Sequence, residues 1–206
     1  QNLVQGLGVD HLAASALFRN ASRTPIEPLE VAPDHPALLM FTSGTAGSPR
    51  IAVLSHGNVA ASIEQSRSSA PGLADKNHVI LGVMPLTHVL GIVSVVAVAI
   101  SVGATVVLAT KPDVDSIVDA VMQNQVTFLV APPVFWFRLA NSEVEPAMLA
   151  SVTMTLSGAA PLSGAVADTV AERFGLKLCQ GYGLTEASPG LTSAVGTEAP
   201  TTSVGR

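Results

Sequence analysis

Short apolar runs alternate with amphipathic segments through most of this chain, beginning near residue 37. The runs predict strands at residues 37–41, 51–54, 79–83, 104–109, 126–130, 152–156 and 176–180. Apolar residues at helical spacing predict helices at residues 59–69, with Asn58 as N-cap, and at 91–101, 113–124, 134–140, 146–150 and 163–174. Strands that alternate with helices in this way predict an α/β fold, with a mostly parallel sheet and helices on both faces.

The stretch from residue 79 to residue 110 contains no Asp, Glu, Lys or Arg. Its length would allow a membrane span, which needs about 20 apolar residues. Ser94, Ser101 and Gly103 interrupt it, however, and no basic flank accompanies it. We therefore interpret it as a buried helix, a turn at Gly103 and a buried strand, because strands of a parallel sheet are covered on both faces and are apolar throughout.

Composition narrows the classes of protein to which the chain can belong. Of its 206 residues, 48% are hydrophobic and only 12% are charged, about half the usual charged fraction of roughly 25%. This balance indicates a buried sheet, or apolar surface that sequence outside the chain normally covers. The net charge is −5 and the Lys and Arg residues are scattered, so we expect no nucleic-acid partner. A peripheral membrane association of the full protein is compatible with this composition.

Cysteine and histidine usage bears on compartment and metal content. Cys179 is the single cysteine, so no disulfide can form within the chain, and its apolar surroundings predict a small buried residue. A lone thiol fits a reducing compartment, and we expect a cytoplasmic protein. The chain begins without Met or a charged leader and ends abruptly, which suggests a fragment rather than a secreted precursor. The five His and the Cys form no close cluster, which argues against structural zinc.

The loop from Thr42 to Arg50, TSGTAGSPR, carries the strongest chemical signal. Its glycines let backbone N–H groups converge, its hydroxyls add short donors, and Arg50 adds a fixed positive charge, which together suit a polyphosphate. A flexible Gly/Ser turn in a hairpin is the alternative. The loop is not a Walker loop, because only two residues separate Gly44 from Gly47, whereas that motif has four between its glycines. The dinucleotide-binding pattern G-x-G-x-x-G does not follow any predicted strand either.

Three further polar or Gly-rich loops follow predicted strands, at residues 84–88, 157–162 and 181–186. In an open parallel sheet, ligands bind beyond the carboxyl ends of the strands. These loops are therefore expected to meet in one crevice, although they are far apart in sequence.

Taken in order, the four segments resemble the adenylate-forming superfamily, which includes acyl-CoA synthetases, luciferases and the adenylation domains of peptide synthetases. They read FTSGTAGSPR with a trailing SHGN, then MPLTH, SGAAPL and QGYGLTE. The resemblance spans about residues 34–206 and implies part of the large N-terminal domain. It divides the chain into a leading segment with a Pro-rich connector at 1–36 and an AMP-binding fragment at 37–206. The C-terminal domain, with its catalytic lysine, is expected outside the chain, so the isolated fragment should not catalyse.

The resemblance implies a reaction in which a carboxylate attacks the α-phosphate of ATP, pyrophosphate leaves, and coenzyme A displaces AMP from the acyl-adenylate. The phosphate loop would hold the β- and γ-phosphates through Thr42, Ser43, Gly44, Thr45, Ala46 and Gly47. Three positions depart from the family's pattern: Arg50 stands where a lysine is usual, Ala46 replaces a threonine, and Ile51 replaces a common glycine. Arginine keeps the positive charge but presents it in a different geometry.

The remaining matches would form the adenine, magnesium and acid sites. Tyr182 would stack on adenine, and the small residues Gly158, Ala159 and Ala160 would form the opposite wall. The residues around the tyrosine, Gly181, Gly183 and Leu184, would also bind the nucleotide. Thr185 would touch the α-phosphate, Glu186 would bind Mg²⁺, and His88 would lie beside the reacting carboxylate. The structural alternatives are a packed core aromatic for Tyr182, a helix-start carboxylate for Glu186 and a core histidine for His88.

The acid is the least determined part of this interpretation. Residues near the expected acid site are apolar or small, and no carboxylate stands ready to face a substrate amine. We therefore expect a fatty-acid–CoA ligase. An aromatic-acid ligase, an enzyme that delivers its acyl group to a carrier protein and a non-catalytic nucleotide-binding module are the alternatives.

Overall fold

The computed structural model describes residues 27, 29–42, 50–69, 76–109 and 111–205. The chain divides into two compact units, Gln1–Val31 and Ala32–Arg206. Of the first unit only residues 27 and 29–31 are described, and they are exposed and belong to no helix or strand. The second unit contains all the elements considered below, whereas most of the predicted leading segment lies outside the described residues.

The centre of the second unit is a four-stranded parallel sheet with the order β4-β3-β5-β6. Its strands are β3 (Val79–Gly82), β4 (Thr105–Leu108), β5 (Phe128–Ala131) and β6 (Met154–Ser157). All residues of β5 are buried, as expected for a central strand covered on both faces. From β3 the chain first moves outward to β4 and then crosses back to β5, so the order reverses beside β3, where open sheets bind ligands.

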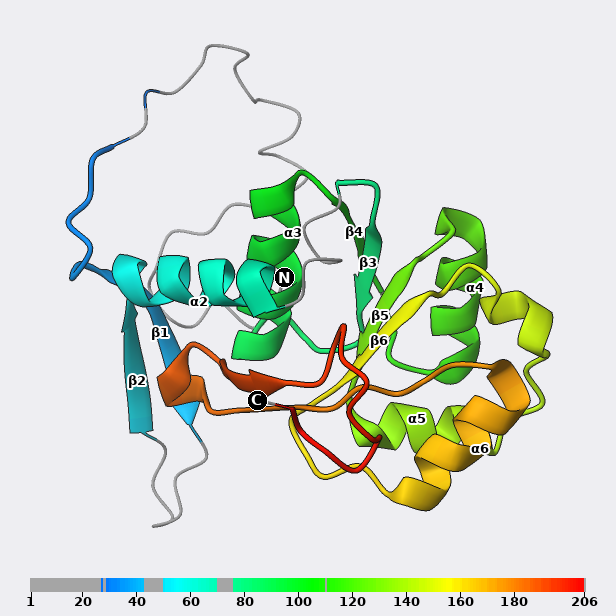
Figure 1. Ribbon diagram of the computed structural model, residues 1–206. Coiled ribbons are helices and arrows are strands. Elements are labelled where there is room, and N and C mark those ends of the chain that lie inside the picture. Colours follow the sequence, from blue (N-terminus) through cyan, green and yellow to red (C-terminus); the bar gives the residue numbers. More distant parts are fainter. Residues whose placement is uncertain (1–26, 28, 43–49, 70–75, 110, 206) are drawn as a thin grey trace, which may run out of the picture. The chain divides into compact units, whose positions relative to one another are not determined.

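Helices cover both faces of this sheet, which confirms the predicted fold class (Figure 1). One face packs against α4 (Val114–Asn124), α5 (Pro133–Ala140) and α6 (Gly164–Phe174), with a 3-10 turn at Pro146–Leu149. The other packs against a π-helical segment, η2 (Leu90–Ala97), which continues into α3 (Val98–Val102). Cys179 packs on this second side, and burial raises the pKa of its thiol, so it stays protonated and unreactive near neutral pH.

The apolar stretch after β3 follows the prediction of helix, turn and strand. Gly103 has a φ of 75° and ends α3, and β4 begins two residues later. Gly91 packs so closely on the preceding loop that a Cβ there would lie 2.5 Å from the Pro85 carbonyl oxygen. Among the described residues no helix combines the length and the apolar character that a bilayer crossing requires.

Two antiparallel hairpins flank the sheet. The first pairs β1 (Pro36–Thr42) with β2 (Arg50–Ser55) and the second pairs β7 (Gly181–Gly183) with β8 (Gly190–Ser193). The predicted strands at 37–41 and 51–54 are therefore present. The central part of the phosphate loop, residues 43–49, lies outside the described residues.

The predicted strand at residues 176–180 is wrong. The segment pairs with the sheet only through a parallel bridge between Ser157 and Gln180. The reason is the Thr155 hydroxyl, which donates to the Lys177 carbonyl at 2.6 Å and accepts from the Cys179 N–H at 3.3 Å. A side chain thus makes the bonds that a backbone ladder would otherwise provide.

The predicted cap of the helix after β2 is also wrong, because α2 runs over His56–Ser69 and includes Asn58. Ser55 caps it instead: its hydroxyl accepts from the Asn58 N–H at 3.1 Å, and the Asn58 amide oxygen accepts from the Ser55 N–H at 3.0 Å. This reciprocal pair is a capping box with Asn in the place of Glu or Gln.

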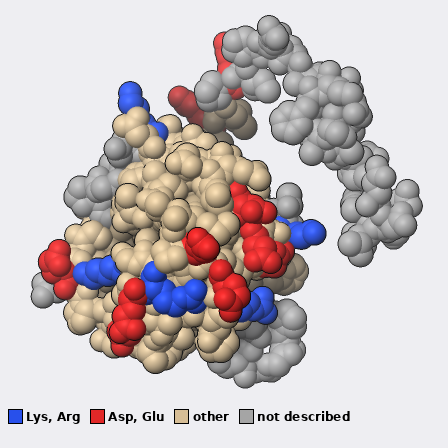
Figure 2. All heavy atoms as spheres, turned by 90° about the vertical axis from the view of Figure 1, so that its right-hand side faces the viewer, with Lys and Arg blue, Asp and Glu red and all other residues tan. Residues whose placement is uncertain are grey.

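Charged side chains of both signs occupy the face of the unit that Figure 2 draws. Figure 2 shows acidic and basic groups interleaved on the face formed by α4, α5 and α6. A mixed pattern of this kind indicates an ordinary solvated surface rather than a docking site for a polyanion.

Candidate active site

A cavity of about 730 Å³ opens at the carboxyl edge of the parallel sheet. Its walls come from the loops after β3 and β6, the β7–β8 hairpin, the 3-10 turn at Thr185–Ala187, the loop end of the β1–β2 hairpin, and α2. The predicted site residues that line it are Thr42, Arg50, His88, Gly158, Ala159, Gly181, Tyr182, Gly183, Leu184, Thr185 and Glu186. The expected convergence of distant loops on one crevice is therefore confirmed.

Two groups of predicted residues do not appear in this lining. Ala160 belongs to the loop after β6 but is not among the residues that line the cavity, whereas its neighbour Ala159 is. The phosphate-loop residues Ser43, Gly44, Thr45, Ala46 and Gly47 lie outside the described residues. Thr42 and Arg50, which flank that loop, face each other across the hairpin, and the Thr42 hydroxyl donates to the Arg50 carbonyl at 3.5 Å.

Tyr182 is a wall of the cavity and is not packed in the core. Its side chain is 49% exposed, and its backbone pairs with Thr192 of β8. The flanking glycines allow β8 to approach: a Cβ on Gly183 would collide with the Pro189 carbonyl oxygen, and one on Gly181 would lie 3.2 Å from the Thr192 oxygen. Glycine on both sides therefore leaves the tyrosine ring as the side chain that this strand offers to the cavity.

His88 has a defined orientation and tautomer. Its ring Nδ1 accepts the Leu90 N–H at 3.2 Å, while its backbone N–H donates to the Pro85 carbonyl at 3.0 Å. When Nδ1 accepts, a neutral imidazole carries its proton on Nε2. His88 can therefore offer an N–H donor to a carboxylate oxygen inside the cavity.

Arg50 and Glu186 are the charged residues in the described lining. Neither forms an ion pair with another described residue. Glu186 fits a magnesium ion held between nucleotide phosphates, because Mg²⁺ in such sites needs only one or two carboxylates and keeps several waters. Within the described residues no group of three potential ligands could hold a metal by protein alone.

Two sets of lining residues were not predicted from the sequence. One is a polar wall of Ser66 and Ser69 on α2 with Ser94 on η2, and the other is an apolar floor that includes Phe128, Leu156 and Val195. Ser62, Ser66 and Ser69 recur at helical spacing, so the sequence signals a hydroxyl-bearing face of α2, but it does not show that this face borders the cavity.

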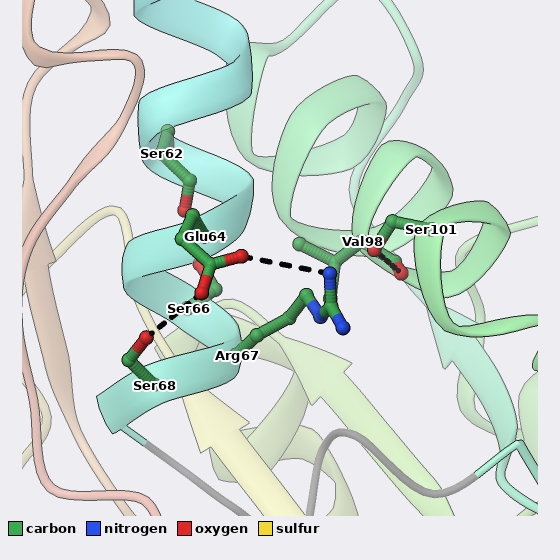
Figure 3. A network of polar contacts seen from close by, with 7 residues as sticks. All are labelled: Ser62, Glu64, Ser66, Arg67, Ser68, Val98 and Ser101. Atoms are coloured by element: carbon green, nitrogen blue, oxygen red, sulfur yellow. Dashed lines mark hydrogen bonds and ion pairs between the residues drawn. The ribbon is translucent and has the colours of Figure 1, made fainter.

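Figure 3 shows how the charged side chains of α2 pair with each other, and neither of them lines the cavity. Glu64 accepts from the Arg67 guanidinium at 3.5 Å and from the Ser68 hydroxyl at 3.2 Å, and Arg67 extends toward α3. The Ser66 hydroxyl donates to the Ser62 carbonyl one turn earlier at 2.9 Å. The charged groups of this helix therefore satisfy one another outside the cavity.

The sequence matches the family described as AMP-binding enzyme over residues 4–206, nearly its whole length. The chain therefore belongs to the AMP-binding enzyme family, in agreement with its parallel sheet and the cavity at the sheet's edge.

Similar proteins of known name are acid–CoA ligases. The chain is 36% identical over 190 residues to 4-coumarate–CoA ligase 3 of Arabidopsis thaliana, covering 90% of this chain and 34% of that enzyme. It is 33% identical over 178 residues to 4-coumarate–CoA ligase 2 of Nicotiana tabacum, covering 84% of this chain and 33% of that enzyme. The chain thus spans about a third of the length of the relatives it matches.

Solved structures of similar proteins have the same fold as the described residues. ATP-bound MatB from Rhodopseudomonas palustris superposes with a TM-score of 0.77 at 24% identity, over 85% of this chain and 34% of that one. A malonyl-CoA ligase complex with methylmalonyl-CoA and AMP superposes with a TM-score of 0.74 at 26% identity, over 84% of this chain and 38% of that one. These structures support the fold of the described residues.

Proposed function

We propose that the protein containing this chain joins a carboxylic acid to the AMP part of ATP, with pyrophosphate leaving from ATP as the acyl-adenylate forms, and that the thiol of coenzyme A then displaces AMP to take up the acyl group. The observation that carries the proposal is the single cavity that gathers Thr42, Arg50, His88, Tyr182 and Glu186 from separate segments. Family membership and the acid–CoA ligases among its relatives support the same reaction.

The nucleotide would occupy the side of the cavity formed by the β7–β8 hairpin and the loop after β6. There the exposed ring of Tyr182 and the small residues Gly158 and Ala159 can enclose a flat base. Arg50 supplies the positive charge near the phosphate loop, and Thr185 a hydroxyl beside the α-phosphate. Glu186 would hold the Mg²⁺ that offsets phosphate charge.

The acid would place its carboxylate beside His88. The Nε2–H group can donate to one carboxylate oxygen and leave the other oxygen free to attack phosphorus. The Leu90 N–H holds the imidazole ring in one orientation. A donor fixed in this way positions the attacking oxygen of the acid. His88 is thus proposed as an orienting group for the attacking oxygen.

The rest of the acid would lie on the apolar floor. Phe128, Leu156 and Val195 line this part with Val89 and Leu90, and no described Lys or Arg lies among them. A second carboxylate there would lose hydration without gaining a partner, which disfavours a dicarboxylic acid such as malonate. The 4-coumarate–CoA ligases among the relatives favour an aromatic monocarboxylic acid over the fatty acid expected from the sequence.

A substrate panel with the full-length natural protein tests this choice. Thioester formation with ATP, Mg²⁺ and coenzyme A would be followed for a hydroxycinnamate, a benzoate, malonate and a long-chain fatty acid. We expect the aromatic acids to give the highest kcat/KM and malonate to give none. Preference for the long-chain acid would return the assignment to a fatty-acid ligase, and preference for malonate would contradict the apolar floor as the acid site.

A further inference from the structure

Gln180 is a buried polar residue that lies behind the cavity rather than in its lining. It is only 6% exposed and immediately precedes the Gly181–Gly183 strand. Its side-chain amide is hydrogen-bonded at both ends: Oε1 accepts the Leu162 N–H at 3.1 Å, and Nε2 donates to the Thr201 carbonyl at 2.6 Å. A buried amide with both bonds fixes the segments that it joins, because breaking either bond leaves a buried polar group without a partner.

These bonds make Gln180 the anchor of the loop that follows β6. The first end of that loop is held at Ser157, which bridges to Gln180 and donates its N–H to the Cys179 carbonyl at 2.7 Å. The second end is held at Leu162 by the Gln180 side chain. Between these anchors lie Gly158 and Ala159, which line the same cavity as the Tyr182 strand.

The clamped loop carries backbone strain. Ala159 has a φ of 72°, in the left-handed region that costs a residue with a Cβ about 1 kcal/mol or more. Such a conformation persists only where surrounding bonds enforce it. The Ser157 hydroxyl, buried at the start of the loop, has no hydrogen-bond partner among the described residues. Both features indicate a loop held in place from outside rather than by its own preference.

We propose that Gln180 is a positioning residue for the nucleotide: it fixes the distance between the Gly158–Ala159 wall and the Tyr182 wall of the slot for the base. The inference rests on the proposed function, because it assigns the base to this slot. One residue controls both walls, since its backbone leads directly into Gly181 while its side chain holds Leu162. Without it the strained Ala159 relaxes and the slot loses its shape for a flat base, whereas the acid site at His88 is unaffected.

The test compares Gln180→Met with the wild type in the full-length natural protein. Methionine keeps the length and loses both hydrogen bonds. We expect the KM for ATP to rise about tenfold, the worth of one or two buried hydrogen bonds, with the KM for the acid unchanged. Hydrogen exchange at the Leu162 amide should accelerate in the same variant, and this readout needs no activity.

A second-site change separates positioning from general damage. Glycine adopts a φ near 72° without penalty, so Ala159→Gly in the Gln180→Met background should recover most of the affinity for ATP. Gln123→Met makes the same chemical change at an exposed site on α4 and should leave all constants at wild-type values. Should Gln180→Met fail to fold, Gln180→Glu, which keeps the acceptor for Leu162, should give a smaller rise in the KM for ATP.

The outcomes are distinguishable. Equal rises in the KM for ATP and for the acid, no change in either, or no faster exchange at Leu162 would overturn the role of Gln180 while leaving the ligase activity intact. A wild-type protein that activates no acid would overturn the proposed function and this inference with it.

Discussion

At the residue scale, single polar contacts define what the cavity offers to a ligand. The Leu90 N–H selects one tautomer of His88. The glycines on either side of Tyr182 let β8 approach closely, and the tyrosine ring is the exposed side chain between them. Arg50, where the family usually has lysine, offers a planar fork of donors rather than a compact ammonium. The sequence identified these residue types, but only the structure shows which atom each presents.

Replacement of His88 tests the proposed orienting role. His88→Ala removes a donor to a charged oxygen, and we expect kcat/KM for acid activation to fall roughly 10- to 100-fold. His88→Asn, which retains an N–H donor on a shorter side chain, should recover part of this loss. Pyrophosphate release by the full-length protein is the measurement, with His35→Ala outside the cavity as the control. A loss no larger than that of the control would contradict the role of His88.

At the element scale, the sequence predicts features with a regular pattern, such as strand direction and helix ends, better than features that depend on contacts between distant segments. Loops after parallel strands converge because strand direction alone requires it, and Gly103 and Gly175 end helices because both adopt φ above zero. The segment 176–180 fails as a strand because the Thr155 hydroxyl takes its backbone bonds. Ser66 and Ser69 were missed because only the packing of α2 brings them to the cavity.

The N-cap of α4, Asp113, is expected to make the stability of the protein depend on pH. Asp113 accepts the Ser116 N–H at 2.9 Å and the Ser116 hydroxyl at 3.0 Å, and these bonds, with Lys111 nearby, lower the pKa of its carboxyl below the ordinary 3.8. A lowered pKa in the folded state stabilises the protein above pH 3.8, and this contribution is lost as the pH falls through the folded-state value.

We therefore expect Asp113→Ala to lower the unfolding temperature at neutral pH and to have no effect once the wild-type carboxyl is protonated. Asp119→Ala, an exposed change in the middle of α4, is the matched control. Thermal unfolding followed by circular dichroism from pH 7 down to below 3.8 measures both. A difference between Asp113→Ala and the wild type that persists unchanged at the lowest pH would contradict the cap.

At the scale of the whole molecule, the low charged fraction has two structural sources. One is the parallel sheet, whose strands are covered on both faces. The other is surface: Leu39, Phe41, Ile51 and Val53 pair across one face of the β1–β2 hairpin and are all more than half exposed. The structure thus shows both a buried sheet and an exposed apolar face among the described residues. The acid could not be predicted from composition, because the apolar floor proposed to hold it is assembled from β5, β6 and the segment after β8.

The central claim is that this cavity belongs to an enzyme that joins a carboxylic acid to AMP. Acid-dependent exchange of labelled pyrophosphate into ATP tests it most directly, because the exchange requires adenylate formation and needs no coenzyme A. With the full-length natural protein and Mg²⁺, we predict exchange that depends on an aromatic acid such as 4-hydroxycinnamate and is lost in Glu186→Ala. Absence of exchange with every acid in the panel, from a folded protein, would contradict the account.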